Sequence, residues 1–247
     1  MIKDLEFILK KIFFSEKYLL EKRLKRAINN NYEKELEIID RYCDKSKDAL
    51  DVGVYRGVYS YKLSQYFKTV HSFEPNPLLY PYLEKNLKKI INNMVLYNLA
   101  LSDVNGTSEL KLPIRSKSIF KNNIEELFKL GAATMHPKNK IENFKKVPVK
   151  MKKLDDIEIN NQIGFIKIDV EGHEKNVLKG GLKTIKNNKP ILLIEIEEKH
   201  TKEPIEDTIN FMKTYNYNAY VYIDKKLVDF NQRDKKQKEI NYIFIHK

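Results

Sequence analysis

From residue 48 onward, short apolar runs of strand length alternate with segments of helical periodicity. This alternation is typical of a mostly parallel sheet that helices cover on both faces. The last two strands are joined without a helical pattern, so we expect that pair to be antiparallel. Strands are predicted at 49–54, 69–73, 94–98, 163–169, 191–196, 217–223 and 240–245, further extended pieces at 106–112 and 147–151, and helices at 57–67, 77–92, 174–186 and 205–215.

Residues 1–47 differ from the rest because their apolar residues recur at three- and four-residue spacing throughout. We expect a helical cap there, placed before one domain at 48–247, and a homodimer through these helices is an alternative use of the same surface. No apolar run approaches the roughly 20 residues of a membrane-spanning helix, and no signal-peptide pattern opens the sequence, so a cytoplasmic protein is expected. The single cysteine, Cys43, excludes a disulfide framework and multi-cysteine zinc modules.

The first predicted strand ends in a turn that suits a ligand. Asp51 closes the apolar run, and Gly53 and Gly57 follow before a helix begins. Glycines let a ligand approach the backbone, and a helix N-terminus offers free N–H groups. The third glycine of the dinucleotide fingerprint is missing, and a carboxylate here would repel a pyrophosphate. The turn therefore favours a ligand with a positive centre or free donors.

The next two strand ends add matching features. Glu74 follows the second strand 23 residues after Asp51, where a carboxylate can accept both hydroxyls of a ribose. Residues 98–103 follow the third strand and lie at the same edge of the sheet. There they could form hydrogen bonds with the ring atoms of an adenine. Three successive strand ends with compatible chemistry indicate a nucleoside-containing ligand.

Four ordered motifs make the sequence resemble the FkbM family of methyltransferases, within the class I S-adenosylmethionine-dependent fold. They are Asp51-Val-Gly-Val-Tyr-Arg-Gly57, Phe73-Glu-Pro-Asn-Pro77, Ala100-Leu-Ser-Asp103 and Ile166-Lys-Ile-Asp-Val-Glu-Gly-His-Glu174. The resemblance covers about residues 48–200. It implies a Rossmann-like, mostly parallel seven-stranded sheet with an antiparallel last strand.

The resemblance also implies a cofactor site for S-adenosylmethionine. Asp51, Gly53 and Gly57 would hold the methionine end, Glu74 the ribose, and the residues from Ala100 the adenine. The family commonly has small residues and Asn where this chain has Val54, Tyr55 and Arg56. The full predicted cofactor set is Asp51, Gly53, Gly57, Ser60, Glu74, Pro75, Asn76, Ala100, Leu101, Ser102 and Asp169.

The fourth motif is the expected chemical centre. Methyl transfer needs an acceptor oxygen placed in line with the sulfonium, and often a base for its proton. Asp169 and Glu171 are expected to hold the acceptor or the cofactor ammonium, and His173 has a suitable unperturbed pKa for a base. A capping or substrate-contact role for His173 is the alternative.

Further acidic residues follow on the next strand. Glu195 and His200 are candidate acceptor contacts. Together with Asp169 and Glu171 they could bind Mg²⁺, although the spacing does not establish a metal site and an exposed polar strand end explains it equally well.

Positive charge is concentrated in one stretch. Residues 111–153 carry 12 Lys and Arg but three acidic residues, and so hold nine of the chain's twelve net positive charges. We expect the insert at 113–146, with a short helix at 124–130, to close as a lid on an anionic acceptor through Arg115, Lys117 and Lys121. A solvated basic loop is the alternative.

These features predict an S-adenosylmethionine-dependent O-methyltransferase that acts on a hydroxyl of a sugar, a polysaccharide precursor or a related small metabolite. A nucleic-acid methyltransferase is less favoured, because the chain has no Asn-Pro-Pro-Tyr-type amine motif, no Pro-Cys nucleophile and no RNA-binding module. A non-catalytic cofactor-binding subunit is a third alternative.

Overall fold

The computed structural model describes residues 14–30, 33–113, 133–136, 143–234 and 238–247. Its centre is an eight-stranded sheet in the order β10-β9-β11-β8-β7-β1-β2-β3. The strands are β1 (Asp48–Val52), β2 (Val70–Phe73), β3 (Met94–Tyr97), β7 (Ile163–Ile168), β8 (Ile191–Glu195), β9 (Tyr217–Ile223), β10 (Lys226–Asp229) and β11 (Asn241–His246). Five neighbouring strands, from β8 to β3, are parallel.

Two strands run against the others. β11 lies between β8 and β9 and is antiparallel to both, as expected for the last pair along the sequence. β10 forms an antiparallel hairpin with β9 at the sheet edge. The predicted count of seven strands is therefore wrong, because the hairpin adds β10 as an eighth strand and as a second antiparallel one.

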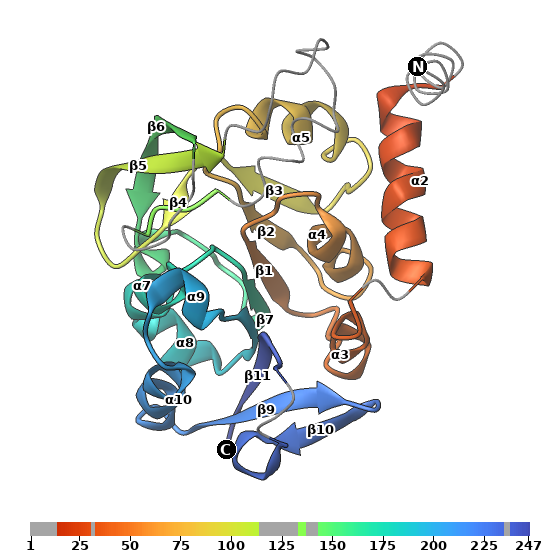
Figure 1. The fold of residues 1–247 in the computed structure, drawn as a ribbon. Helices are drawn as coiled ribbons and strands as arrows, with labels where there is room; N and C mark the ends of the chain where they lie inside the picture. The colour runs from red at the N-terminus through yellow and green to blue at the C-terminus, as the bar shows by residue number, and fades with distance from the viewer. Residues whose placement is uncertain (1–13, 31–32, 114–132, 137–142, 235–237) are drawn as a thin grey trace.

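Helices cover both faces of the sheet (Figure 1). Alternate strand residues point to opposite faces, so Leu50 and Ile166 join one apolar cluster while Ala49 and Phe165 join another. One face packs against α7 (Glu174–Gly180), α8 (Leu182–Asn188) and α10 (Ile205–Lys213). The other face packs against α3 (Leu36–Arg41) and α4 (Val58–Leu63), with α5 (Tyr80–Asn86) beside them.

The N-terminal helix α2 (Glu16–Asn29) lies outside the second helical layer. Its side chains Leu20 and Leu24 are buried in one cluster with Leu83 and Leu87 of the α5 region. Residues 1–13 are outside the described part of the chain, so the predicted cap at 1–47 and its use in a dimer stay predictions.

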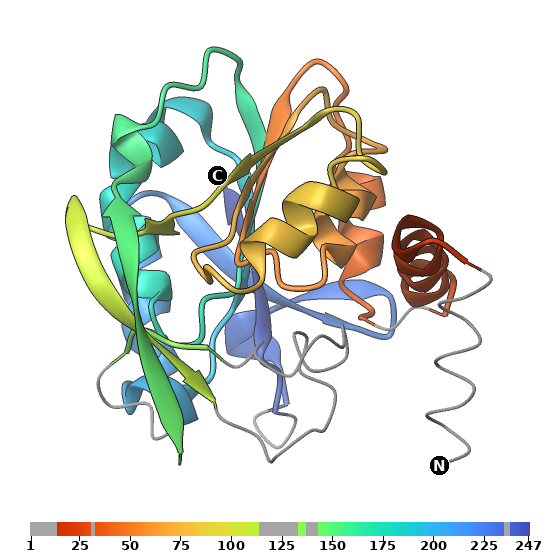
Figure 2. The same ribbon diagram turned by 90° about the horizontal axis from the view of Figure 1, so that it is seen from above.

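A smaller three-stranded sheet flanks the main one. It contains β4 (Ala100–Leu101), β5 (Gly106–Pro113) and β6 (Phe144–Lys152) in the order β4-β6-β5. Figure 2 shows β5 and β6 on the side of the molecule opposite α2. The predicted helix at 124–130 lies outside the described residues.

Candidate active site

The turns after β1 and β7 meet at the carboxyl edge of the parallel strands. Gly53 has φ +93°, and a Cβ atom built on it would lie 1.8 Å from the Asp169 carbonyl oxygen. The Asp169 N–H donates to the Val52 carbonyl at 2.9 Å. A side chain at Gly53 would therefore be excluded twice, by the backbone conformation and by this contact. The contact holds the Asp169 backbone beside the first turn.

Glu74 lies at the end of β2 and is buried. Its Oε2 accepts a hydrogen bond from the Tyr55 N–H at 3.0 Å, and its Oε1 accepts one from the Asn76 N–H at 2.9 Å. Tyr55 has a left-handed backbone (φ 48°), which is uncommon for a residue other than glycine. Burial raises the pKa of Glu74 to about 7, although the two backbone bonds lower it. Each oxygen keeps acceptor capacity for a ligand.

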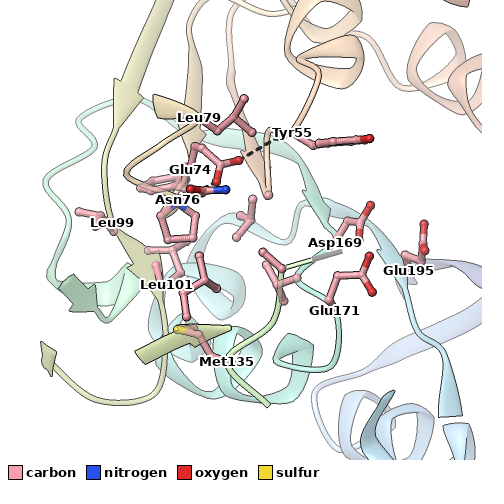
Figure 3. Close-up of a pocket in the computed structure, with 18 of the residues that line it drawn as sticks. Tyr55, Glu74, Asn76, Leu79, Leu99, Leu101, Met135, Asp169, Glu171 and Glu195 are labelled. Carbon is pink, nitrogen blue, oxygen red and sulfur yellow. Dashed lines mark hydrogen bonds between the residues drawn. The ribbon is translucent and has the colours of Figure 1, made fainter. Parts of the chain in front are cut away.

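A cavity of about 450 Å³ opens between these strand ends. Figure 3 shows Asp169, Glu171 and Glu195 gathered on one side of it and Leu99, Leu101 and Met135 on the other. It is lined by Glu33, Val52, Gly53, Tyr55, Arg56, Phe73, Glu74, Pro75, Asn76, Leu79, Leu99, Ala100, Leu101, Leu110, Ala133, Met135, Asp169, Val170, Glu171 and Glu195. One end of the cavity is therefore acidic and the other apolar.

Ionisation is disfavoured at the acidic end. Burial, followed by the neighbouring Asp169, raises the pKa of Glu171 to about 8. The same two causes raise the pKa of Glu195 to about 7. His200 Nδ1 lies 3.1 Å from Glu171 Oε2, and buried Lys167 has its Nζ 4.0 Å from Asp169 Oδ2. A cation entering this end would relieve the repulsion among the carboxylates.

Seven of the predicted cofactor residues line the cavity: Gly53, Glu74, Pro75, Asn76, Ala100, Leu101 and Asp169. Four do not: Asp51, Gly57, Ser60 and Ser102. Asp51 is buried and accepts a hydrogen bond from the Ser60 hydroxyl, which also bonds to Ser72 at 2.9 Å. Gly57 faces the Leu87 side chain, which a Cβ would meet at 2.5 Å. These four residues support the cavity walls from behind.

His173 is also outside the cavity lining. Its Nε2 lies 2.9 Å from the Ser102 hydroxyl, and burial lowers its pKa to about 4. The ring is therefore neutral at physiological pH and already engaged. His173 is the residue before the first turn of α7, but its side chain makes no capping hydrogen bond, so its predicted roles as a base or a substrate contact stay predictions.

The predicted acceptor contacts have different outcomes. Glu195 lines the cavity, and His200 contacts the lining residue Glu171. Arg115, Lys117 and Lys121 lie outside the described residues, and so does most of the insert.

Within the described ranges, no group of three or more His, Cys, Asp or Glu side chains could hold a metal ion, so Mg²⁺ is not supported. In the same ranges, no helix is long and apolar enough to cross a membrane.

Sequence reasoning missed several lining residues. Glu33 comes from the connection between α2 and α3, and Met135 from the far end of the insert. Thr134 fixes this end, because its hydroxyl donates to the Glu171 carbonyl at 2.6 Å and its backbone pairs with Lys111. No motif marks either segment. Leu99 could have been found, since it lies directly after the third strand beside the predicted adenine contacts.

Comparisons with known proteins agree with this geometry. The FkbM methyltransferase domain model matches residues 51–219. A methyltransferase FkbM from Methylobacillus flagellatus has a similar structure, with a TM-score of 0.51, 16% identity, and coverage of 82% of this chain and 44% of that one. A candidate rRNA methylase from Clostridium thermocellum gives a TM-score of 0.50 at 11% identity, with coverage of 86% and 91%. These structures share the fold.

This chain thus spans less than half the length of the Methylobacillus protein. No curated protein sequence matches it. The family model covers more than half of the chain and includes the strand ends that form the cavity. The chain belongs to the FkbM methyltransferase family.

Proposed function

We propose that this methyltransferase uses S-adenosylmethionine and transfers its methyl group to a hydroxyl of a sugar, a polysaccharide precursor or a related small metabolite. The observation that carries the proposal is the arrangement of the cavity, with Glu74 between an apolar end and an acidic end. A ligand with a flat apolar ring, a ribose and a positively charged tail matches that order.

The residues present fit this cofactor. Glu74 holds the ribose, because its two oxygens retain acceptor capacity after their backbone bonds. Leu99 and Leu101 contact the adenine from the apolar end. Glu171 and Glu195 receive the ammonium group, because a bound cation offsets the repulsion that these two side chains feel from the neighbouring carboxylates. S-adenosylmethionine supplies an electrophilic methyl group on a positively charged sulfur.

The chain's own contribution to the chemistry is orientation and proton acceptance. Asp169 lines the cavity, and its backbone is held against Gly53, so its carboxylate has a fixed place beside the acceptor hydroxyl. We assign the acceptor proton to this carboxylate. Without a ligand Glu171, with a pKa of about 8, is mainly protonated at neutral pH, and the bound ammonium favours its ionised form. His173 positions the wall through Ser102.

Replacing Glu74 tests the cofactor site. Glu74→Gln removes the charge from two charge-assisted bonds to the ribose, so S-adenosylmethionine binding should weaken by about 1.5–3 kcal/mol, or roughly tenfold or more. Titration calorimetry measures the change, and Glu158→Gln at an exposed position is the control. Equal affinity in the wild type and Glu74→Gln, with both folded, would place the ribose elsewhere.

Isotope transfer tests the acceptor class. The enzyme is incubated with S-adenosylmethionine labelled in its methyl group, together with sugar nucleotides, hydroxy acids or ribosomal RNA. We expect label in an ether of a small hydroxyl compound, and much less of it with Asp169→Asn. Label found in RNA alone would support a nucleic-acid methyltransferase instead.

A further inference from the structure

A second cavity, of about 500 Å³, lies between α2 and the turn after β1. It shares five lining residues with the first cavity, so the two adjoin: Glu33, Gly53, Tyr55, Arg56 and Asp169. Its remaining walls are Leu20, Arg23, Leu24, Arg26, Ala27, Asn30, Leu36, Val54, Val58 and Tyr59. Most of these residues precede position 51, where the match to the family domain begins. A transfer enzyme needs two adjoining sites, and the molecule provides them.

The two cavities differ in charge. Among the described residues, the charged side chains that line the first cavity alone are Glu74, Glu171 and Glu195. Those that line the second cavity alone are Arg23 and Arg26, both on α2. The shared Arg56 guanidinium lies over the Tyr55 ring, 5.0 Å from its centroid, at the junction. The first cavity therefore suits a cation, whereas the α2 side of the second suits an anion.

The rest of the second cavity is mainly apolar. Leu20, Leu24, Leu36 and Val54 are buried and form part of its wall. The Tyr59 hydroxyl is also buried, and burial, followed by the nearby Glu33 carboxylate, raises its pKa well above the usual value. Apolar contacts together with guanidinium groups suit an amphipathic anion.

We propose that the second cavity binds the methyl acceptor, and that this acceptor has an apolar body and a carboxylate or phosphate group held by Arg23 and Arg26. This inference rests on the proposed function, because the first cavity then holds the cofactor. Asp169 lines both cavities, which puts one carboxylate within reach of both reactants. The rival occupant is the carboxylate of the cofactor itself, extending past Arg56.

The test uses the anionic dye 8-anilinonaphthalene-1-sulfonate, whose sulfonate substitutes for the carboxylate or phosphate. S-adenosylhomocysteine affinity is first measured by calorimetry, and the dye is then titrated by fluorescence into enzyme saturated with that product. We expect the dye to bind the saturated enzyme. Arg23→Gln/Arg26→Gln should weaken dye binding roughly tenfold or more and leave S-adenosylhomocysteine affinity unchanged. Displacement by octanoate or octyl phosphate then identifies the preferred anion.

The control is Lys17→Gln/Lys22→Gln, which removes the same charge from exposed positions of α2 outside the cavity lining. Its dye affinity should match the wild type. If the double arginine variant does not fold, the single change Arg26→Gln, at an exposed position, replaces it. The salt dependence of dye binding to the wild type is then measured as well.

Four results would overturn the inference: no dye binding, equal effects of the two double variants, competition between the dye and S-adenosylhomocysteine, or no displacement by either octyl anion. Competition would assign the cavity to the cofactor tail. Failure of S-adenosylhomocysteine to bind at all would instead refute the proposed function, so the two failures are distinguishable.

Discussion

At the scale of single residues, the acidic end of the first cavity has a cost for folding. Glu171 has an ordinary carboxyl pKa of 4.5 when exposed and a pKa of about 8 in the folded chain. The folded state therefore holds a proton more tightly than the unfolded state. Stability from this group is fully present below the unfolded pKa and is lost as the pH rises to the folded value.

The change Glu171→Gln tests this cost. The neutral amide removes the penalty of ionising a buried carboxyl, so the variant should exceed the wild type in unfolding free energy by about 1–3 kcal/mol near pH 9. Near pH 4 the difference should be close to zero. Urea unfolding at both pH values measures it, with exposed Glu158→Gln as the reference. A gain that does not depend on pH would show that charge is not the cause.

At the scale of elements, one glycine explains why the predicted helix at 174–186 is two helices. A Cβ on Gly180 would lie 1.9 Å from the Ser102 carbonyl oxygen, and Gly181 follows as the boundary residue before α8. The close approach lets α7 lie against the end of β4. Helical periodicity continues through this point, so sequence spacing could not reveal the break.

Gly180→Ala should therefore destabilise the protein by about 1–3 kcal/mol, because the added methyl group forces the β4 end away from α7. Alanine is otherwise the better helix former, so intrinsic propensity predicts the opposite sign. The urea midpoint separates the two predictions. Lys179→Ala, one residue earlier and exposed, serves as the comparison and should change little.

The missed strand β10 has a different cause. It is an edge strand without a fully buried residue, so it lacks the apolar pattern of its neighbours. Its hairpin depends on Asp224 and Lys225, which both adopt positive φ, at 47° and 60°. Asp at the first turn position favours a hairpin turn with positive φ, but Lys at the second position does not predict one.

At the scale of the whole molecule, segments near the two ends of the chain are joined. The Arg41 guanidinium of α3 donates to the Tyr222 hydroxyl at 3.0 Å and to the Lys225 carbonyl at 2.6 Å. The Tyr222 hydroxyl in turn donates to Glu37 at 2.6 Å. These bonds connect the N-terminal helices to the β9–β10 hairpin.

A double-mutant cycle measures this connection. Arg41→Met and Tyr222→Phe each remove one partner, and we expect a coupling free energy of about 0.5–1.5 kcal/mol between them. Urea unfolding of the four proteins gives the value. Strictly additive effects would mean that the bond between the Arg41 guanidinium and the Tyr222 hydroxyl adds nothing to the connection.

The grouping of Gly53, Glu74, Ala100 and Asp169 around the first cavity was predictable, because successive parallel strands end at one edge of the sheet. The second cavity was not. This cavity depends on where α2 lies in the fold. The spacing of apolar residues predicts which face of a helix is buried, but it does not predict which part of the protein that face packs against.

The contact between Gly53 and the Asp169 carbonyl also affects motion. Two turns whose backbones touch cannot separate without breaking the junction of β1 and β7, so this point acts as a fixed pivot of the cleft. If the two cavities hold the two proposed reactants, we expect widening for product release to come from the opposite walls, α2 and the Ala133–Met135 segment. Movement of α2 would open the second cavity, and movement of the Ala133–Met135 segment would open the first. The order in which the two products leave would then depend on which wall moves first.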